Sequence, residues 1–115
     1  MASEVVNKLT ADFLKALAHP VRVEVLKMLA PGERCVCELV EELEVEQSNL
    51  SQHLAVMRRQ GLIEARKEGT KVLYRVTDPS VLAVLRSVEA AIGAQLSRSQ
   101  DILAFLRQRG DKDAD

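Results

Sequence analysis

The chain has 115 residues, of which 47% are hydrophobic and 29% charged, a composition that fits one folded domain and leaves no room for a separate catalytic domain. No apolar run approaches the roughly 18 residues of a membrane span, and no basic stretch precedes an apolar one at the N-terminus, so we expect a cytoplasmic protein with no membrane partner. The net charge of −1 excludes a uniformly basic protein, so any surface for nucleic acid must be local.

Four helices are predicted before residue 60. Apolar residues at helical spacing predict one helix from about Ser3 to Leu17. Pro20, which suits a first helical turn, opens a second helix that runs to about Ala30. A short helix over residues 36–43 and another over about residues 47–59 are separated by a tight break, which is the helix-turn-helix arrangement.

A β-hairpin is predicted next along the chain. The segments from Leu62 to Glu68 and from Lys71 to Thr77 are strand-like and flank a turn at Gly69. In a winged helix-turn-helix, the second helix of the pair enters the major groove and such a hairpin, the wing, reaches the neighbouring backbone or minor groove. The order of elements therefore predicts that fold.

A long last helix begins at Asp78-Pro79, an N-cap followed by proline at the first helical position. Its apolar stripe is too long for so small a monomer to cover, so we expect a homodimer through residues 79–107, helped by residues 3–17. The small polar residues 110–115 are expected to form a flexible tail. The stripe consists of Val81, Leu85, Val88, Ile92, Leu96, Ser99, Leu103 and Leu106.

The predicted fold is mainly α with a small β-hairpin, a homodimeric winged helix-turn-helix in ααααββα order, with a single domain over residues 1–109. Its core should be aliphatic, because the chain contains only three aromatic residues. We expect His53, which lies beside Leu50 and Met57 on one helical face, to be a packed core histidine and not a ligand. His19, before a proline, is expected at a helix start.

Charge changes sign in the middle of the chain. Residues 33–46 contain six acids and one base, a net charge of −5, whereas residues 47–75 contain six bases and two acids, a net charge of +4. A basic segment inside an acidic chain is typical of a local DNA-binding face. Alternatively, the acidic segment is the contact surface of a protein-interaction module.

The segment from Glu46 to Val76 is the predicted DNA-reading part of the chain. Short polar side chains at the start of its helix are expected to reach base edges or phosphates; they are Gln47, Ser48, Asn49, Ser51 and Gln52. Basic side chains at the helix end and on the hairpin are expected to bind phosphates; they are Arg58, Arg59, Arg66, Lys67, Lys71 and Arg75.

Several motifs in order resemble one family, the ArsR/SmtB (arsenic-repressor) family of bacterial metal-sensing repressors. They are Ala16-Leu17-Ala18-His19-Pro20-Val21-Arg22, Cys35-Val36-Cys37-Glu38-Leu39, Gln47-Ser48-Asn49-Leu50-Ser51-Gln52-His53-Leu54, Gly61-Leu62-Ile63 and Tyr74. The resemblance, which covers roughly Leu14 to Val88, implies a dimeric winged helix that binds an inverted repeat in double-stranded operator DNA. It implies repression that is relieved by an inducer. Glu44 and Glu46 depart from it, since family members often carry Gly and Ser there.

The two cysteines, Cys35 and Cys37, are one residue apart, which is a poor disulfide framework, so we expect reduced thiols. Soft thiolates prefer thiophilic ions. Residues i and i+2 of a helix point about 200° apart, so both sulfurs reach one ion only if the helix start is distorted. By resemblance, these thiols bind the inducer, trivalent arsenic or antimony, with Cd(II) and Pb(II) as alternatives and no cofactor required. The third cysteine of many arsenic sensors corresponds to Val40.

Other roles for the two thiols stay open. They could respond to oxidation or persulfides, or they could be small apolar residues that sense nothing. A dithiol oxidoreductase is disfavoured because the Cys-x-Cys sequence lacks a strand-helix-strand context, and no other set of residues suggests catalysis. We therefore predict that the chain is not an enzyme.

Overall fold

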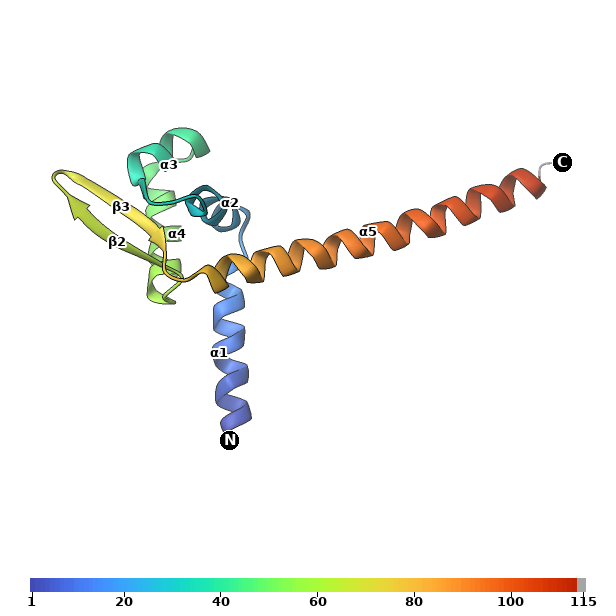
Figure 1. Cartoon of the computed structure of the whole chain (residues 1–115), viewed down its shortest axis with the longest axis horizontal. Helices are drawn as coiled ribbons and strands as arrows, with labels where there is room; N and C mark the ends of the chain where they lie inside the picture. Colours follow the sequence, from blue (N-terminus) through green and yellow to red (C-terminus); the bar gives the residue numbers. More distant parts are fainter. Residues whose placement is uncertain (114–115) are drawn as a thin grey trace. The chain divides into compact units, whose positions relative to one another are not determined.

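The computed structural model describes residues 1–113, and this part of the chain contains five α-helices and three β-strands (Figure 1). In chain order they are α1 (Ala2–Leu17), α2 (Pro20–Leu29), β1 (Arg34–Cys35), α3 (Val36–Leu43), α4 (Gln47–Arg59), β2 (Ile63–Glu68), β3 (Lys71–Val76) and α5 (Pro79–Asp113). These bounds agree with the predicted elements to within one residue, except at the end of α5 and at β1, which was not predicted.

The chain divides into two compact units, residues 1–82 and the residues from 83 onward. The first unit holds α1 to β3 and the first turn of α5, and the second holds the rest of α5. The single domain over residues 1–109 stays a prediction. An apolar stripe in a sequence does not say whether its own chain or a second copy covers it, and in α5 the stripe from Val88 onward is exposed.

The core of the first unit is aliphatic, as predicted. On α4, Leu50, Leu54 and Met57 recur at helical spacing and are almost completely buried. They pack with equally buried leucines from neighbouring elements, among them Leu26 of α2 and Leu39 of α3. Burial of such aliphatic side chains is the main favourable contribution to folding of the unit.

The sheet is antiparallel in the order β1-β3-β2. Gly69 turns the β2–β3 hairpin with a φ of 63°, a backbone conformation that glycine adopts without steric cost. On the other edge of β3, the two residues of β1 pair with it, and Cys35 lies opposite Leu73. A strand of two residues shows no alternation of apolar and polar residues, which is why the sequence did not predict β1.

Several helix ends are stabilised by the residues that the sequence singles out. His19 is the N-cap of α2, and its Nδ1 accepts a hydrogen bond from the backbone N–H of Val21. Before α5, Asp78 accepts one from the backbone N–H of Ser80, and this bond lowers the pKa of the Asp78 carboxyl. Gly61, with a φ of 75°, follows the end of α4. The expectation that His19 and Asp78 lie at helix starts is thus confirmed.

Helix α5 is longer than predicted. It continues through Asp113, so residues 110–113, expected to be a flexible tail, are helical, and residues 114–115 of that tail lie outside the described residues. The polar composition of residues 110–113 hid this, since it carries no apolar periodicity. Nowhere in residues 1–113 is a helix long and apolar enough to cross a membrane.

Candidate nucleic-acid interface

The start of α4, which we call the reading segment, exposes the polar side chains that the sequence predicts for DNA contact. All five are exposed: Gln47, Ser48, Asn49, Ser51 and Gln52. Leu50, between them, is buried and fixes the face of α4 that turns inward. Short side chains with both donors and acceptors on an exposed helix start are suited to base edges in a major groove.

The basic residues on the wing and at the end of α4 fall into two classes, and the first has no ion-pair partner. Arg58 and Arg59 are exposed at the C-terminal end of α4, and Lys67 and Lys71 are exposed beside the hairpin turn. Within the part of the chain that the structure describes, none of these four side chains forms an ion pair. Their charge is free to meet phosphate.

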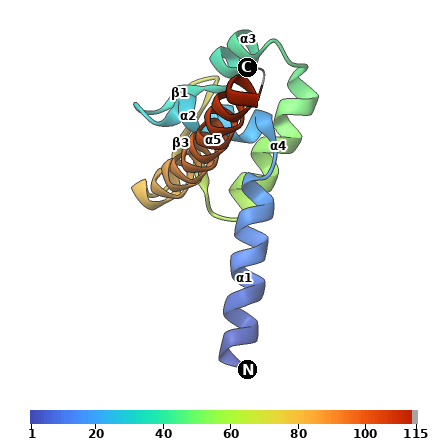
Figure 2. The same cartoon turned by 90° about the vertical axis from the view of Figure 1, so that its right-hand side faces the viewer.

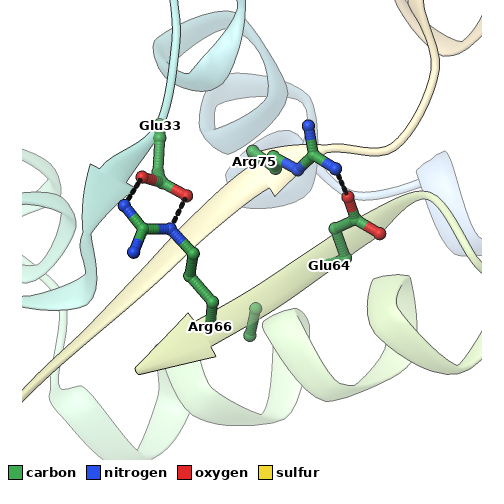
Figure 3. Close-up of a pocket in the computed structure, with 5 residues that line it drawn as sticks. Glu33, Glu64, Arg66 and Arg75 are labelled. Atoms are coloured by element: carbon green, nitrogen blue, oxygen red, sulfur yellow. Dashed lines mark hydrogen bonds and ion pairs between the residues drawn. The ribbon is translucent and has the colours of Figure 1, made fainter. Parts of the chain in front are cut away.

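The second class is held by carboxylates of the same chain. Both carboxylate oxygens of Glu33 accept hydrogen bonds from Arg66, at 2.8 Å from Nε and 2.6 Å from Nη2 (Figure 3). Nη2 also donates to Glu68 at 3.1 Å, and Arg75 pairs with Glu64 on the adjacent strand. To bind phosphate as predicted, these two arginines must exchange a carboxylate for it.

A cavity of about 280 Å³ lies on this outer face of the sheet, lined by Glu33, Glu64, Ala65, Arg66 and Arg75. The hydrogen bonds from Arg66 hold the pKa of the Glu33 carboxyl below its usual value, and Glu33 raises the pKa of Arg66 in turn. Both charges are therefore present at neutral pH. The sequence analysis missed the role of Glu33, because it lies 33 residues from Arg66 and no local spacing connects them.

On the acidic side of the interface, α3 is partly neutralised. Arg34 donates to Glu38 at 3.0 Å and also binds Glu42 through both guanidinium Nη atoms. These bonds lower the pKa of the Glu42 carboxyl and raise that of Arg34. The surface offered as the alternative protein-interaction face is thus less strongly negative than its count of acids indicates.

Behind the reading segment, His53 is 8% exposed and its Nδ1 accepts a hydrogen bond from Arg22 Nε at 3.0 Å. The interpretation of His53 as a packed core histidine is therefore confirmed. The sequence analysis did not assign a role to Arg22, although it ends one of the motifs that carry the family resemblance.

Cys35 and Cys37 are joined by a disulfide, where reduced thiols were expected. The correction has a geometric reason. Cys35 lies outside the helix, as the extended N-cap of α3, so the opposed directions of residues i and i+2 within a helix do not apply. Cys35 is buried and Cys37 exposed, and Cys35 Sγ accepts a hydrogen bond from the backbone N–H of Cys37 at 3.2 Å. The described residues contain no group of three His, Cys, Asp or Glu side chains placed to hold a metal ion.

Comparison with known proteins places this geometry among regulators. A family model described as "Bacterial regulatory protein, arsR family" matches residues 19–65. The uncharacterised HTH-type transcriptional regulator Rv0081 of Mycobacterium tuberculosis is 38% identical over 96% of this chain and 97% of its own length. Its crystal structure matches with a TM-score of 0.74 over 80% of this chain and 93% of that chain.

Two further matches cover the same elements. The transcriptional activator HlyU of Vibrio cholerae is 46% identical over 63% of this chain and 67% of its own length. The homodimeric winged helix-turn-helix DNA-binding domain of a possible ArsR-family regulator from Mycobacterium bovis is 29% identical, with a TM-score of 0.75 over 84% of this chain and 89% of that chain. Both proteins are described by a role in transcription regulation, the function predicted here for this chain. The chain is a winged helix-turn-helix transcriptional regulator and belongs to the arsR family of bacterial regulatory proteins.

Proposed function

We propose that the chain is a repressor that binds an inverted repeat in operator DNA as a homodimer. The observation that supports this most directly is the exposed polar reading segment of α4 beside a wing whose turn is flanked by two unpaired lysines, Lys67 and Lys71. The exposed apolar stripe of α5 supports the dimer. Two copies related by a twofold axis would present two reading segments to the two half-sites of the repeat.

Binding to duplex DNA tests this proposal. A labelled duplex selected by the protein from a random-sequence library should bind with an affinity that falls steeply with salt, because phosphate contacts release counterions. Gln52→Ala and Ser51→Ala should weaken binding to the selected duplex more than to a mixed-sequence one. Lys71→Ala should weaken binding to both duplexes alike and lower the salt dependence. A salt-independent affinity would instead favour the protein-interaction module.

We further propose that trivalent arsenic or antimony releases the repressor by binding the reduced thiols of Cys35 and Cys37. Reduction of the disulfide by two electrons gives two neighbouring thiols, which suit a thiophilic ion. No third protein ligand lies beside them in residues 1–113, so water, a second protomer or an external thiol must complete the coordination. Since Cys35 caps α3 and pairs with Leu73 of the wing, its displacement would reach both elements directly.

Release by arsenite and antimonite is the test of the inducer. The protein, reduced with a phosphine that contains no thiol, is titrated with each ion while bound to the selected duplex. The double variant Cys35→Ser/Cys37→Ser keeps a cap acceptor at residue 35, so it should bind DNA like the parent and resist release. Equal release of parent and variant by arsenite would remove the thiols as its site.

A second inducer chemistry is favoured by one observation, the disulfide itself. In this alternative, oxidation of the two thiols, or their reaction with a persulfide, changes DNA affinity. Diamide or polysulfide, added without arsenite, should then alter binding by the parent and leave the double serine variant unaffected. Response to arsenite but not to these oxidants would assign the site to the metalloid alone.

A further inference from the structure

A polar cluster joins three helices of the first unit at the place where α1 ends beside α2 and α4 (Figures 1 and 2). At its centre is the Arg22 guanidinium of α2. Its Nε donates to His53 Nδ1 of α4 at 3.0 Å, and its Nη1 donates to the carbonyl oxygens of Lys15 and Ala16 at 3.2 and 3.5 Å. Arg22 thus satisfies the last carbonyls of α1, where a helix carries partial negative charge, and holds α4 with the same planar group.

A second histidine fixes the other side of His53. The rings of His19 and His53 are 4.2 Å apart between centroids and tilted by 42°. His19 is itself held in place as the N-cap of α2, because its Nδ1 accepts a hydrogen bond from the backbone N–H of Val21. His53 is therefore contacted by His19 of the α1–α2 connection and by Arg22 of α2. It belongs to α4, the helix that carries the reading segment.

The hydrogen bond between Arg22 and His53 requires one protonation state. A guanidinium only donates, so His53 Nδ1 must be without a proton to accept from it. Burial lowers the pKa of His53, and so do the nearby charges of His19 and Arg22; these are the titratable and charged groups that act on it from the neighbouring elements. A proton on Nδ1 would remove the acceptor and place two cations in contact.

We propose that Arg22 and His53 are positioning residues that tie the reading segment of α4 to the C-terminal end of α1, and that the tie holds only while His53 is neutral. His53 directly follows Gln52, and Asn49 lies one turn before it. A loosened His53 therefore displaces these side chains from the bases that they read. The inference rests on DNA binding by α4 and is independent of any inducer at the cysteines.

The first experiment compares DNA affinity at two pH values. An imidazole acquires its proton between about pH 7.5 and about pH 5.5. Over this range, uptake of one proton per protomer should lower the affinity of the parent for the selected duplex by at most about tenfold for each pH unit. His53→Asn keeps an acceptor near the position of Nδ1 but does not titrate, so its affinity should fall much less over this range. His19→Asn keeps the cap acceptor but removes the imidazole that contacts His53; it should retain a pH dependence, because His53 still titrates in it.

Two results distinguish a positioning role of these residues from a merely structural one. At neutral pH, Arg22→Lys, which keeps the charge but not the planar donors, should bind more weakly than the parent although circular dichroism shows it folded, and His53→Asn should bind with a flattened pH profile. If His53→Asn retains the pH profile of the parent, or if Arg22→Lys binds like the parent, the proposal is wrong. Failure of the parent to bind at neutral pH would instead overturn the placement of the DNA interface.

The second measurement needs no variant. If DNA requires neutral His53, linkage demands that bound DNA lowers the pKa of His53 in the parent. Nuclear magnetic resonance of the imidazole signals, with and without the selected duplex, measures this pKa directly. A pKa of His53 that is the same in free and bound protein would overturn the proposal even if every variant folded poorly.

Discussion

At the scale of single residues, the wing holds fewer available positive charges than its sequence contains. Arg66 is bound by both oxygens of Glu33, with a geometry like that of an arginine on phosphate. Arg75 is bound by Glu64. Counting bases in the sequence predicted six phosphate ligands, but the pairing of two of them depends on distant or cross-strand residues, which a count does not see. The other four bases need not exchange a partner to bind phosphate.

Replacement of Glu33 should strengthen DNA binding. Glu33→Gln removes the carboxylate that competes for Arg66, so affinity for a mixed-sequence duplex should rise, and the slope of log affinity against log salt should steepen by about 1 per protomer. Fluorescence anisotropy over a range of salt concentrations measures both quantities. Glu41→Gln, an equal change of charge on the exposed face of α3, is the control; if it matches Glu33→Gln, released Arg66 is not the cause.

Stability should depend on pH through His53. Its pKa in the folded protein is lowered from the ordinary histidine value of 6.5, chiefly by burial, so the unfolded chain binds more protons in the interval between the two values. The contribution of His53 to the free energy of unfolding should therefore be fully present above about pH 6.5 and should be lost as the pH drops through that interval. Urea denaturation at a series of pH values measures it, and His53→Asn should flatten this part of the curve. A fall of equal size in His53→Asn would assign the dependence to other groups.

At the scale of elements, the sequence predicted most of the fold because each signal was local. Pro20, Asp78 and Gly61 mark helix ends by their own chemistry, and the buried face of α4 repeats at helical spacing. What it could not predict depends on partners far along the chain. The strand β1 exists only through its pairing with β3, and the central hydrogen bond of the Arg22 cluster joins two residues that are 31 positions apart.

The turn between α3 and α4 departs from the local rules at two sites, Glu44 and Glu46, which are separated by Val45. Glu44, the C-cap of α3, has φ 54° and ψ 40°, a left-handed conformation that is unfavourable for residues other than glycine. Glu46, the N-cap of α4, accepts no side-chain hydrogen bond from the helix. Both are the positions where the sequence departs from the family pattern of Gly and Ser, so the structure gives those departures a physical cost.

Glu44→Gly should stabilise the fold. Relief of the left-handed strain outweighs the added freedom of the unfolded chain, and we expect a gain of about 0.5–1 kcal/mol in the free energy of unfolding. Chemical denaturation with urea checks the value. Glu41→Gly, within the same helix, should instead cost about 0.5–1 kcal/mol. If both variants lose stability equally, the conformation of Glu44 carries no strain.

At the scale of the whole molecule, the second unit presents a line of exposed apolar side chains. The side chains of Ile92 and Leu96 are 49% and 60% exposed, and Leu103 and Leu106 are exposed to a similar extent. In α1, Val6 and Leu9 are exposed as well. Apolar side chains aligned in this way along a helix are a typical subunit contact, which agrees with the proposed homodimer.

A charge placed in this stripe should separate the subunits. Ile92→Glu should shift the sedimentation equilibrium from dimer to monomer, because a carboxylate buried without a partner in the contact is strongly unfavourable. Affinity for the selected duplex should fall with it, since two half-sites are then no longer bound together. Ala94→Glu, on the opposite face of α5, is the control and should remain dimeric. A dimeric Ile92→Glu variant would move the subunit contact away from this stripe.

The spacing of the α5 stripe also determines how two such helices would wind. Val81, Leu85 and Val88 are followed eleven positions later by Ile92, Leu96 and Ser99, and Leu103 begins the next repeat. A seven-residue repeat winds paired helices into a left-handed supercoil, whereas an eleven-residue repeat gives a slight right-handed one. Insertion or removal of eleven residues in α5 would therefore keep its contact line in phase, and a change of about nine, which is two and a half turns, would move part of the stripe to the opposite face of the helix.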